Sequence, residues 1–267
     1  SRREGQKLAI KSDIESSEGL RAELERLRGS AKQILQLVES VPSDVVDANN
    51  VAYALSLLAK PRPHGFGRPR SGTGVFRGVG WAALRSRLPY CVLEADLGSY
   101  MGIISSLAWL KFRPSADLLR AMDQRFGALL SDVDAHTLPS LLRTQTSIAR
   151  PSATSLSAAA ERVVEVGDTL SETDIVTCLR SLSTAGASPS MSVSERLGDL
   201  AVKISQATSL PNLRSLVLAM FKLESVEQVA LSSLCLQLES RIPLIGTQPL
   251  RSVEPSKPTE PTEPTEP

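Results

Sequence analysis

The sequence predicts an all-α protein, a short α-solenoid of helix–turn–helix repeats of about 37–38 residues. Leucine is its commonest residue, whereas aromatic residues make up only 4%, a composition that favours helices over strands. Apolar residues recur at spacings of three and four, which places them on one helix face. A Pro-Ser pair also recurs after 37 and then 38 residues, at 114–115, 151–152 and 189–190. These patterns together predict stacked helix pairs.

Each of these Pro-Ser pairs is predicted to open the first helix of a unit, because proline presets the backbone and serine supplies a hydroxyl for the first turn. Positions 8, 12 and 15 after the proline are apolar in all three copies. They are Met122, Phe126 and Leu129, then Ala159, Val163 and Val166, then Leu197, Ala201 and Ile204. Position 11 is Arg125, Arg162 and then Leu200, so the polar face repeats less well. An irregular all-α domain remains the alternative.

A Leu-rich second helix is predicted after each first helix and also in two earlier segments. The predicted second helices cover residues 45–59, 96–110, 138–148, 175–182 and 213–223. Asp134 and Asp174 precede two of them and are the expected N-caps, because a carboxylate accepts hydrogen bonds from the free N–H groups of a first turn. A last helix, 226–238, is predicted to close the array.

Both ends of the chain and one internal segment depart from the repeat. Residues 17–38 are predicted to form one amphipathic helix that caps the array, within an N-terminal part covering 1–43. The array is assigned to 44–240 and is interrupted at 60–80 by an irregular insertion with six glycines and three prolines. Residues 241–267 end in three Thr-Glu-Pro repeats and are predicted to be extended.

The cysteines and histidines do not form a pattern typical of an enzyme or a metal centre. Cys91, Cys178 and Cys235 are far apart in the sequence and include no CxxC pair, which argues against a disulfide scaffold and a structural zinc site. Cys178 lies in an apolar helical pattern and is predicted to belong to the core. His64 and His136 have no carboxylate-plus-nucleophile arrangement nearby, and we interpret them as surface or helix-terminus histidines.

The remaining candidates for chemistry have simpler explanations. Asp132 with Asp134, and Glu172 with Asp174, fall at predicted helix starts, where capping accounts for them. Residues 67–74, GRPRSGTG, have the glycine spacing of a phosphate-binding loop but not its Lys-Ser or Lys-Thr end. The best candidate for a membrane span, 101–110, is too short to cross a bilayer. We therefore expect a soluble protein that is not an enzyme and has no cofactor.

The formal net charge of +1 conceals a strongly basic segment. No acid occurs between Asp47 and Glu94, whereas seven basic residues do, giving this segment a charge of +7. Two further basic residues precede the unit-opening Pro114. The predicted RNA-binding residues are Lys60, Arg62, Arg68, Arg70, Arg77, Arg85, Arg87, Lys111 and Arg113.

The composition of the basic segment favours contact with a nucleic acid. Six of its seven cations are arginines, whose planar guanidinium suits phosphates and guanine edges. Phe66, Phe76, Trp81 and Tyr90 lie among them as possible stacking surfaces for bases. Two alternatives stay open, namely a solvated loop whose charge only aids solubility and a site for an acidic protein surface.

Residues 106–119, SLAWLKFRPSADLL, resemble the octotricopeptide and heptatricopeptide helical repeats of organelles, relatives of the arrays in FAST kinase-like proteins. Residues 52–60, AYALSLLAK, and 216–223, LVLAMFKL, are similar to the second helix of these repeats. The resemblance covers roughly residues 44–238. It does not extend to a C-terminal nuclease-like RAP domain, because the chain soon runs into the Thr-Glu-Pro tail, so RNA cleavage is not implied.

The resemblance implies an organellar RNA-binding protein. About four units are too few for base-by-base readout of a long site, which favours a mitochondrial ribosome subunit that stabilises rRNA through the basic loop, next to ribosomal or RNA-processing proteins. A plastid location, a free RNA-processing or stability factor, and a protein-interaction scaffold of an organellar assembly are the alternatives. The basic start Ser1-Arg2-Arg3 fits either removal of a targeting peptide or an arbitrary boundary.

Overall fold

The computed structural model of the protein describes residues 14–59, 78–223 and 228–242. Within these ranges the chain forms helices and no strand, which confirms the predicted all-α class. The helices are α1 (Ser17–Arg26), α2 (Ala31–Ser40), α3 (Ala48–Ala59), α4 (Val79–Glu94), α5 (Leu97–Trp109), α6 (Ala116–Leu129), α7 (Leu138–Ile148), α8 (Ala153–Val166), α9 (Glu172–Ala185), α10 (Met191–Ser205), α11 (Leu210–Lys222) and α12 (Gln228–Arg241).

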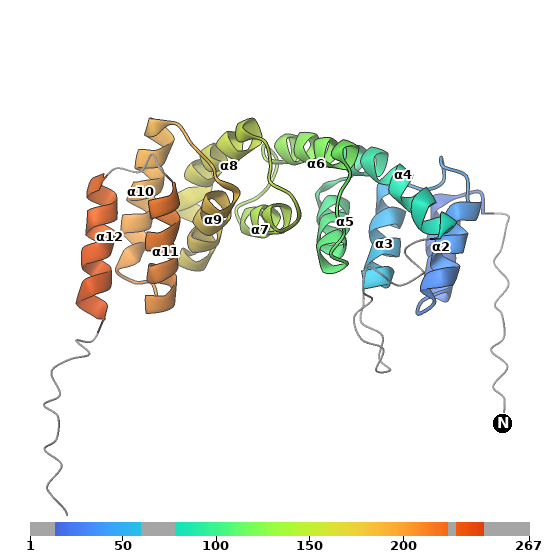
Figure 1. Ribbon diagram of the computed structural model, residues 1–267, viewed down its shortest axis with the longest axis horizontal. Coiled ribbons are helices and arrows are strands. Elements are labelled where there is room, and N and C mark those ends of the chain that lie inside the picture. Colours follow the sequence, from blue (N-terminus) through green and yellow to red (C-terminus); the bar gives the residue numbers. More distant parts are fainter. Residues whose placement is uncertain (1–13, 60–77, 224–227, 243–267) are drawn as a thin grey trace, which may run out of the picture.

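The helices stack in two layers. The first layer contains α2, α4, α6, α8, α10 and α12, and the second layer contains α1, α3, α5, α7, α9 and α11. Each helix packs on the next helix of its own layer, as the prediction of a helical solenoid requires. The stack bends into an arch whose hollow side carries second-layer helices, seen most plainly for α3, α5 and α7 (Figure 1).

The Pro-Ser pairs begin first-layer helices in a slightly different way from that predicted. The serines Ser115, Ser152 and Ser190 have extended backbones and occupy the N-cap, so each proline lies just before the helix rather than in its first turn. Ser115 Oγ accepts a hydrogen bond from the Leu118 N–H, and Ser152 Oγ accepts one from the Ser155 N–H. Serine is among the preferred N-cap residues because its hydroxyl satisfies one of the free first-turn donors.

The predicted core positions of the repeat are confirmed. Eight of the nine apolar residues at positions 8, 12 and 15 are buried, and Val166 is half-buried. Phe126 and Met122 are fully enclosed between the layers. The buried side chains of all units join into one continuous core, so each unit depends on its neighbours for burial.

The second-layer helices agree with the predicted ranges, with shifted ends. Helix α7 has the predicted bounds, whereas α9 begins at Glu172 and α11 at Leu210, each three residues early. The N-cap of α9 is therefore Ser171 and not Asp174, which instead accepts a 2.6 Å hydrogen bond from the Ser171 hydroxyl. Asp134 is likewise not the N-cap of α7, which is Thr137; its Oδ1 accepts a hydrogen bond from the Thr137 N–H, in the turn that precedes α7.

The prediction of one helix over 17–38 is wrong, because the chain forms α1 and α2 instead. Gly29 separates them with a φ of +100°, a conformation that glycine adopts without the steric cost of a side chain. The break lets α2 pack on α4 in the first layer while α1 packs on α3 in the second. Asn50 fixes α1 to α3, since its side-chain N–H group donates to Ser17 O at 3.0 Å.

A buried polar contact ties α5 to the next two helices. The Tyr100 side chain is fully buried, and its hydroxyl lies 2.9 Å from the Met122 carbonyl oxygen and 2.8 Å from Gln145 Oε1. Burial raises the pKa of the Tyr100 phenol far above its usual range, so the group stays a hydrogen-bond donor. Gln145 is also buried, and its side-chain Nε2 has no hydrogen-bond partner within the described residues.

Candidate nucleic-acid interface

The described part of the chain contains four of the nine predicted RNA-binding residues. Lys60, Arg62, Arg68, Arg70 and Arg77 lie outside it, as do His64, Phe66 and Phe76. The described members are Arg85 and Arg87 on α4, and Lys111 and Arg113 in the turn between α5 and α6.

Arg85 and the turn after α5 meet at Phe112. The Arg85 guanidinium carbon lies 5.4 Å from the centroid of the Phe112 ring, within the range of a cation–π contact. Trp81 is buried and makes an edge-to-face contact with Phe112, with its ring centroid 5.6 Å from that of Phe112 and an interplanar angle of 83°. Because Phe112 stands between Lys111 and Arg113 in sequence, the contact brings three exposed cations to one region of the surface.

Lys111 stays on this surface through an unusual backbone conformation. Its φ is +51°, in the left-handed region where glycine is favoured. The turn ends α5 with hydrogen bonds from the Lys111 N–H to Ala108 O at 3.1 Å and from the Phe112 N–H to Leu107 O at 3.0 Å. This pattern is a helix-ending motif that usually has glycine at this position. Lys111 therefore keeps a positive charge at a position whose backbone conformation glycine adopts at a lower steric cost.

Arg87 has a structural role that its sequence context does not reveal. Its two terminal nitrogens donate to Val38 O at 2.7 Å and Val41 O at 2.9 Å, at the C-terminal end of α2. A cation that donates to the last carbonyls of a helix is favoured both by hydrogen bonding and by the helix dipole. The half-buried Arg87 is therefore engaged with α2, whereas the other three described candidates remain exposed.

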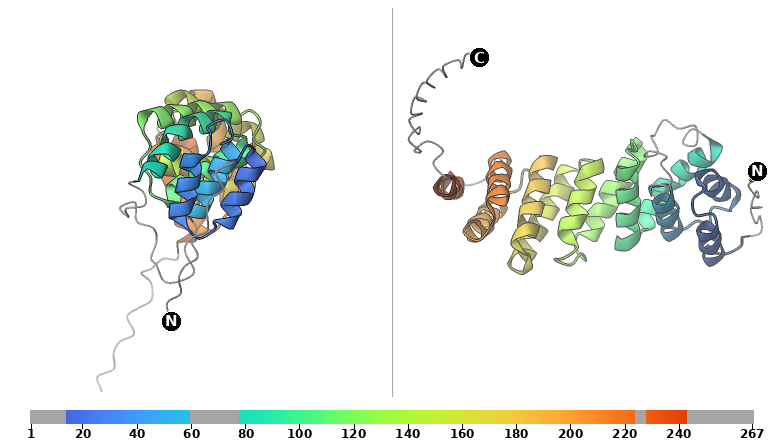
Figure 2. Two further views of the ribbon diagram at one scale, coloured as in Figure 1. Left: turned by 90° about the vertical axis from the view of Figure 1, so that its right-hand side faces the viewer. Right: turned by 90° about the horizontal axis from the view of Figure 1, so that it is seen from below.

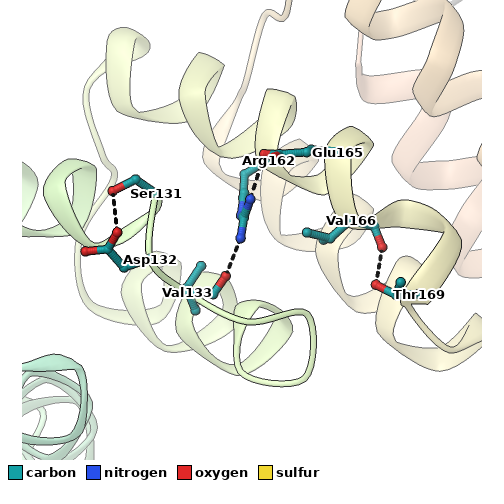
Figure 3. A network of polar contacts seen from close by, with 7 residues as sticks. All are labelled: Ser131, Asp132, Val133, Arg162, Glu165, Val166 and Thr169. Carbon is teal, nitrogen blue, oxygen red and sulfur yellow. Dashed lines mark hydrogen bonds and ion pairs between the residues drawn. The ribbon is translucent and has the colours of Figure 1, made fainter.

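Arg87 is one of several arginines that join successive first-layer helices. Arg125 Nε donates to Ala95 O at 2.6 Å, Arg162 donates to Val133 O at 2.8 Å, and Arg241 donates to Thr208 O at 2.7 Å. Figure 3 shows Arg162 between the Val133 carbonyl and Glu165, whose carboxylate accepts a 2.7 Å bond. Each carbonyl belongs to the residues that follow the preceding first-layer helix, so the arginines tie the layer together.

The third repeat has Leu200 rather than an arginine at position 11, and packing explains this difference. Arg125 and Arg162 make these bonds from position 11, whereas Leu200 takes that position in α10. Leu200 lies against Gly167, the C-cap of α8, and a Cβ at Gly167 would be 2.6 Å from Leu200 Cδ1. Position 11 therefore contacts a residue that follows the preceding first-layer helix in all three copies, by a hydrogen bond in two and by apolar packing in one.

The predicted stacking aromatics divide between core and surface. Trp81 is only 6% exposed and is unavailable to a base, whereas Tyr90 is 73% exposed on α4. A pocket of about 430 Å³ opens beside the first turn of α4. Lys32 and Glu39 line it with opposite charges, together with Trp81, so its walls do not select an anion or a cation.

The structure offers little for other chemistry in the described residues. Cys178 is fully buried, which confirms its predicted place in the core, and burial raises the pKa of its thiol to about 12. Burial likewise raises the pKa of Cys91 to about 11. His136 is exposed. The described ranges contain no group of three metal-ligating side chains, and none of their helices is long and apolar enough to cross a bilayer.

Sequence reasoning missed three exposed arginines in the second layer, namely Arg143 on α7, Arg180 on α9 and Arg214 on α11. Each is a single cation among serines, threonines and apolar residues, so no cluster of charge marks it in the sequence. The separation of 37 residues between Arg143 and Arg180 equals the repeat period and was the available signal. A scan of known protein families and a search of curated proteins found no match to the chain.

Proposed function

We propose that the chain is a non-enzymatic RNA-binding helical-repeat protein that stabilises a folded RNA as a subunit of an organellar ribonucleoprotein. The mitochondrial ribosome is the first candidate, with rRNA as the ligand, and a plastid particle is the alternative. The organellar setting rests on the resemblance of residues 106–119 to organellar repeats. The RNA-binding role rests on the structure and charge of the basic region.

The observation that carries this proposal is the contact between Arg85 and Phe112. This contact places the exposed Arg85, which belongs to the acid-free segment, beside Lys111 and Arg113, which belong to a different unit. Exposed arginine and lysine side chains bind phosphates, and each phosphate that they neutralise releases counterions. A helical array holds such a cluster on a rigid surface, which suits the clamping of a folded RNA.

The test of this proposal is a variant that combines Arg85→Gln, Lys111→Gly and Arg113→Gln. Glycine at 111 removes the charge and also suits the φ of +51°. With a labelled transfer RNA as the probe, we expect about tenfold weaker binding at low salt and a salt dependence lower by about two to three ion equivalents. Fluorescence anisotropy over a salt series measures both quantities.

The matched control for this variant combines Arg120→Gln, Arg196→Gln and Lys203→Gln, which removes the same charge from exposed sites on α6 and α10. Equal losses in the two variants, or none in either, would contradict the proposed site. The predicted residues outside the described ranges are tested in parallel by replacing Arg68, Arg70 and Arg77 with alanine.

The second candidate function is a protein-interaction scaffold, which the C-terminal end of the array favours. Val229 and Leu236 on α12 are 74% and 66% exposed. The outer end of a terminal repeat is normally polar, as it is for α1 with its exposed Glu18 and Arg21.

Replacing Val229 and Leu236 with lysine is the test of the scaffold function. We expect a scaffold to lose its associated proteins in these variants, because a charge disrupts an apolar contact. The measurement is the set of proteins that stays bound after nuclease treatment. Partners that leave with the RNA in the wild-type protein would instead support the RNA-binding function.

A further inference from the structure

The exposed side chains of the second-layer helices follow a common register. Ser105 on α5 corresponds to Arg143, Arg180 and Arg214 on the next three second-layer helices, at separations of 38, 37 and 34 residues. Four residues later in each helix, a second exposed position follows. The members of this second line are Trp109, Ser147, Thr184 and Leu218. All eight residues are exposed, so the two lines run across neighbouring helices on one surface.

The three arginines of the first line have no partner in the described part of the chain. The guanidinium groups of Arg143, Arg180 and Arg214 make no hydrogen bond or ion pair there. Helices α7 and α11 contain no acid, and the acids of α9 are Glu172 and Asp174 in its first turn. At a rise of about 1.5 Å per residue, Asp174 is roughly 9 Å along the helix from Arg180.

The first layer provides a contrast within the same protein. Two of its exposed cations have acidic partners, Arg120 with Asp117 at 2.5 Å and Lys203 with Asp168 at 2.8 Å. The Lys203 contact holds the pKa of the Asp168 carboxyl below its usual range. Acidic partners thus compensate Arg120 on α6 and Lys203 on α10, whereas Arg143, Arg180 and Arg214 have none in the described residues.

The row of arginines is placed for an extended ligand. Helices α5 and α7 lie on the hollow side of the arch (Figure 1). Helices α9 and α11 continue the same layer, since α9 packs on α7 and α11 packs on α9, and the view from below shows the helices side by side along the length of the arch (Figure 2). Packed helices are about 8–10 Å apart, so the row presents one cation per helix along the direction in which the array extends. A linear polyanion can contact all three.

The chemistry of the surface favours a nucleic-acid strand over a protein helix. No large apolar side chain of α7 or α9 is exposed, and the exposed apolar members of the second line, Trp109 and Leu218, lie on α5 and α11 at its two ends. A partner helix would therefore find no apolar anchor on the two helices that carry Arg143 and Arg180. Phosphates need only cations and hydroxyl donors, and Thr184 provides an exposed hydroxyl next to the row. Phe221, seven residues after Arg214 and 72% exposed, offers a ring on which an unpaired base can stack.

We propose that Arg143, Arg180 and Arg214 form a second RNA-binding surface, which holds the sugar–phosphate backbone of a single-stranded segment along the hollow side of the arch, with Phe221 stacking on a base. This inference rests on the proposed RNA-binding function and adds to it a ligand class and a site. It is separate from the Arg85–Phe112 region, which belongs to α4 and the turn before α6.

The test compares the triple variant Arg143→Gln, Arg180→Gln and Arg214→Gln with the outer control of Arg120→Gln, Arg196→Gln and Lys203→Gln. The probe is a labelled oligouridine RNA of about 20 nucleotides, long enough to exceed the site sizes of known single-strand binders. We expect the triple variant of the second layer, here called the inner variant, to bind about tenfold more weakly at low salt. The slope of its log affinity against log salt concentration should be lower by about 2, because each lost phosphate contact removes about 0.7 from that slope. The outer control should stay within about twofold, since two of its three cations, Arg120 and Lys203, already have acidic partners.

Phe221→Ala separates stacking from charge. It is expected to weaken oligouridine binding about fivefold without changing the salt slope, because a stacked base releases no counterion. A lower slope in this variant, or an unchanged affinity, would remove Phe221 from the site. The thermal midpoints of all variants serve as the folding control, since substitutions of exposed residues have small effects on stability.

The outcomes distinguish this inference from the function on which it rests. If the Arg85, Lys111 and Arg113 variant weakens transfer RNA binding while the inner variant binds oligouridine like the outer control, only the second surface is overturned. If the wild-type protein binds neither RNA, both proposals fail. Equal competition by a double-stranded RNA, or by polyglutamate, would overturn the assignment to a single strand.

Discussion

Replacing Gly80 with alanine is expected to lower the free energy of unfolding by about 2–3 kcal/mol. A Cβ at this position would lie 2.5 Å from the carbonyl oxygen and 2.8 Å from the carbonyl carbon of Leu35. Both atoms belong to the backbone of α2, so no rotation of a side chain relieves the overlap and α2 must move away from α4. That movement would also strain the hydrogen bonds from Arg87 to Val38 and Val41. Urea unfolding followed by circular dichroism measures the change.

Gly127→Ala is the matched control for this substitution. Gly127 lies inside α6, and the nearest atom to an added Cβ is Ser155 Oγ at an ordinary 3.6 Å. Alanine there should stabilise the protein by about 0.5–1 kcal/mol, because glycine costs this much in a helix interior. Similar changes in the two variants would show that the approach of α2 to α4 does not decide the effect at Gly80.

The architecture could be predicted because its signals are periodic. The buried residues at positions 8, 12 and 15 repeat with the unit, and repetition distinguishes a pattern from chance. The break between α1 and α2 has no such support, since the apolar spacing of residues 17–38 continues across Gly29. The glycine was a visible sign of a break, but the packing of α2 on α4 and of α1 on α3 decides where the chain turns.

The boundaries of the candidate site could not be predicted from charge alone. Arg85 and Arg87 belong to the same acid-free segment, and both were assigned to RNA binding. Two residues along a helix correspond to a turn of about 200°, so their side chains point to different sides of α4. Arg85 reaches the surface beside Phe112, whereas Arg87 reaches the end of α2. A count of charges cannot separate these roles, because the difference depends on which face of α4 packs on α2.

The arginines at position 11 show that the role of a polar residue is also hard to predict from its own helix. A polar residue on a helix of the array would ordinarily be interpreted as solvated, yet Arg125 and Arg162 donate to carbonyls that follow the preceding first-layer helix. The carbonyls after a helix end lack intrahelical partners, and this need recurs with every unit. Position 11 is therefore determined by the neighbouring unit rather than by its own helix, which is why arginine and Leu200 both occur there.

Replacing Tyr100 with alanine is expected to destabilise the protein by about 4 kcal/mol, since it removes a fully buried aromatic ring between α5, α6 and α7. Tyr100→Phe keeps the ring and removes only the hydroxyl, and should cost about 1–2 kcal/mol. Most of this smaller cost arises at Gln145, whose buried Oε1 loses its 2.8 Å contact with the phenol. Chemical unfolding of both variants separates the packing contribution from that of the hydroxyl.

A second substitution tests whether Gln145 carries the cost of Tyr100→Phe. Gln145 is 1% exposed, and its Nε2 already has no partner in the described part of the chain. Adding Gln145→Leu to Tyr100→Phe replaces the unpaired amide with an apolar side chain of similar size, so the double variant should recover about 1 kcal/mol relative to Tyr100→Phe. In the wild-type background the same Gln145→Leu change leaves the phenol without this contact and should give no such gain. If Gln145→Leu instead had the same effect in both backgrounds, the two side chains would be energetically independent, and the hydroxyl would act only through the Met122 carbonyl.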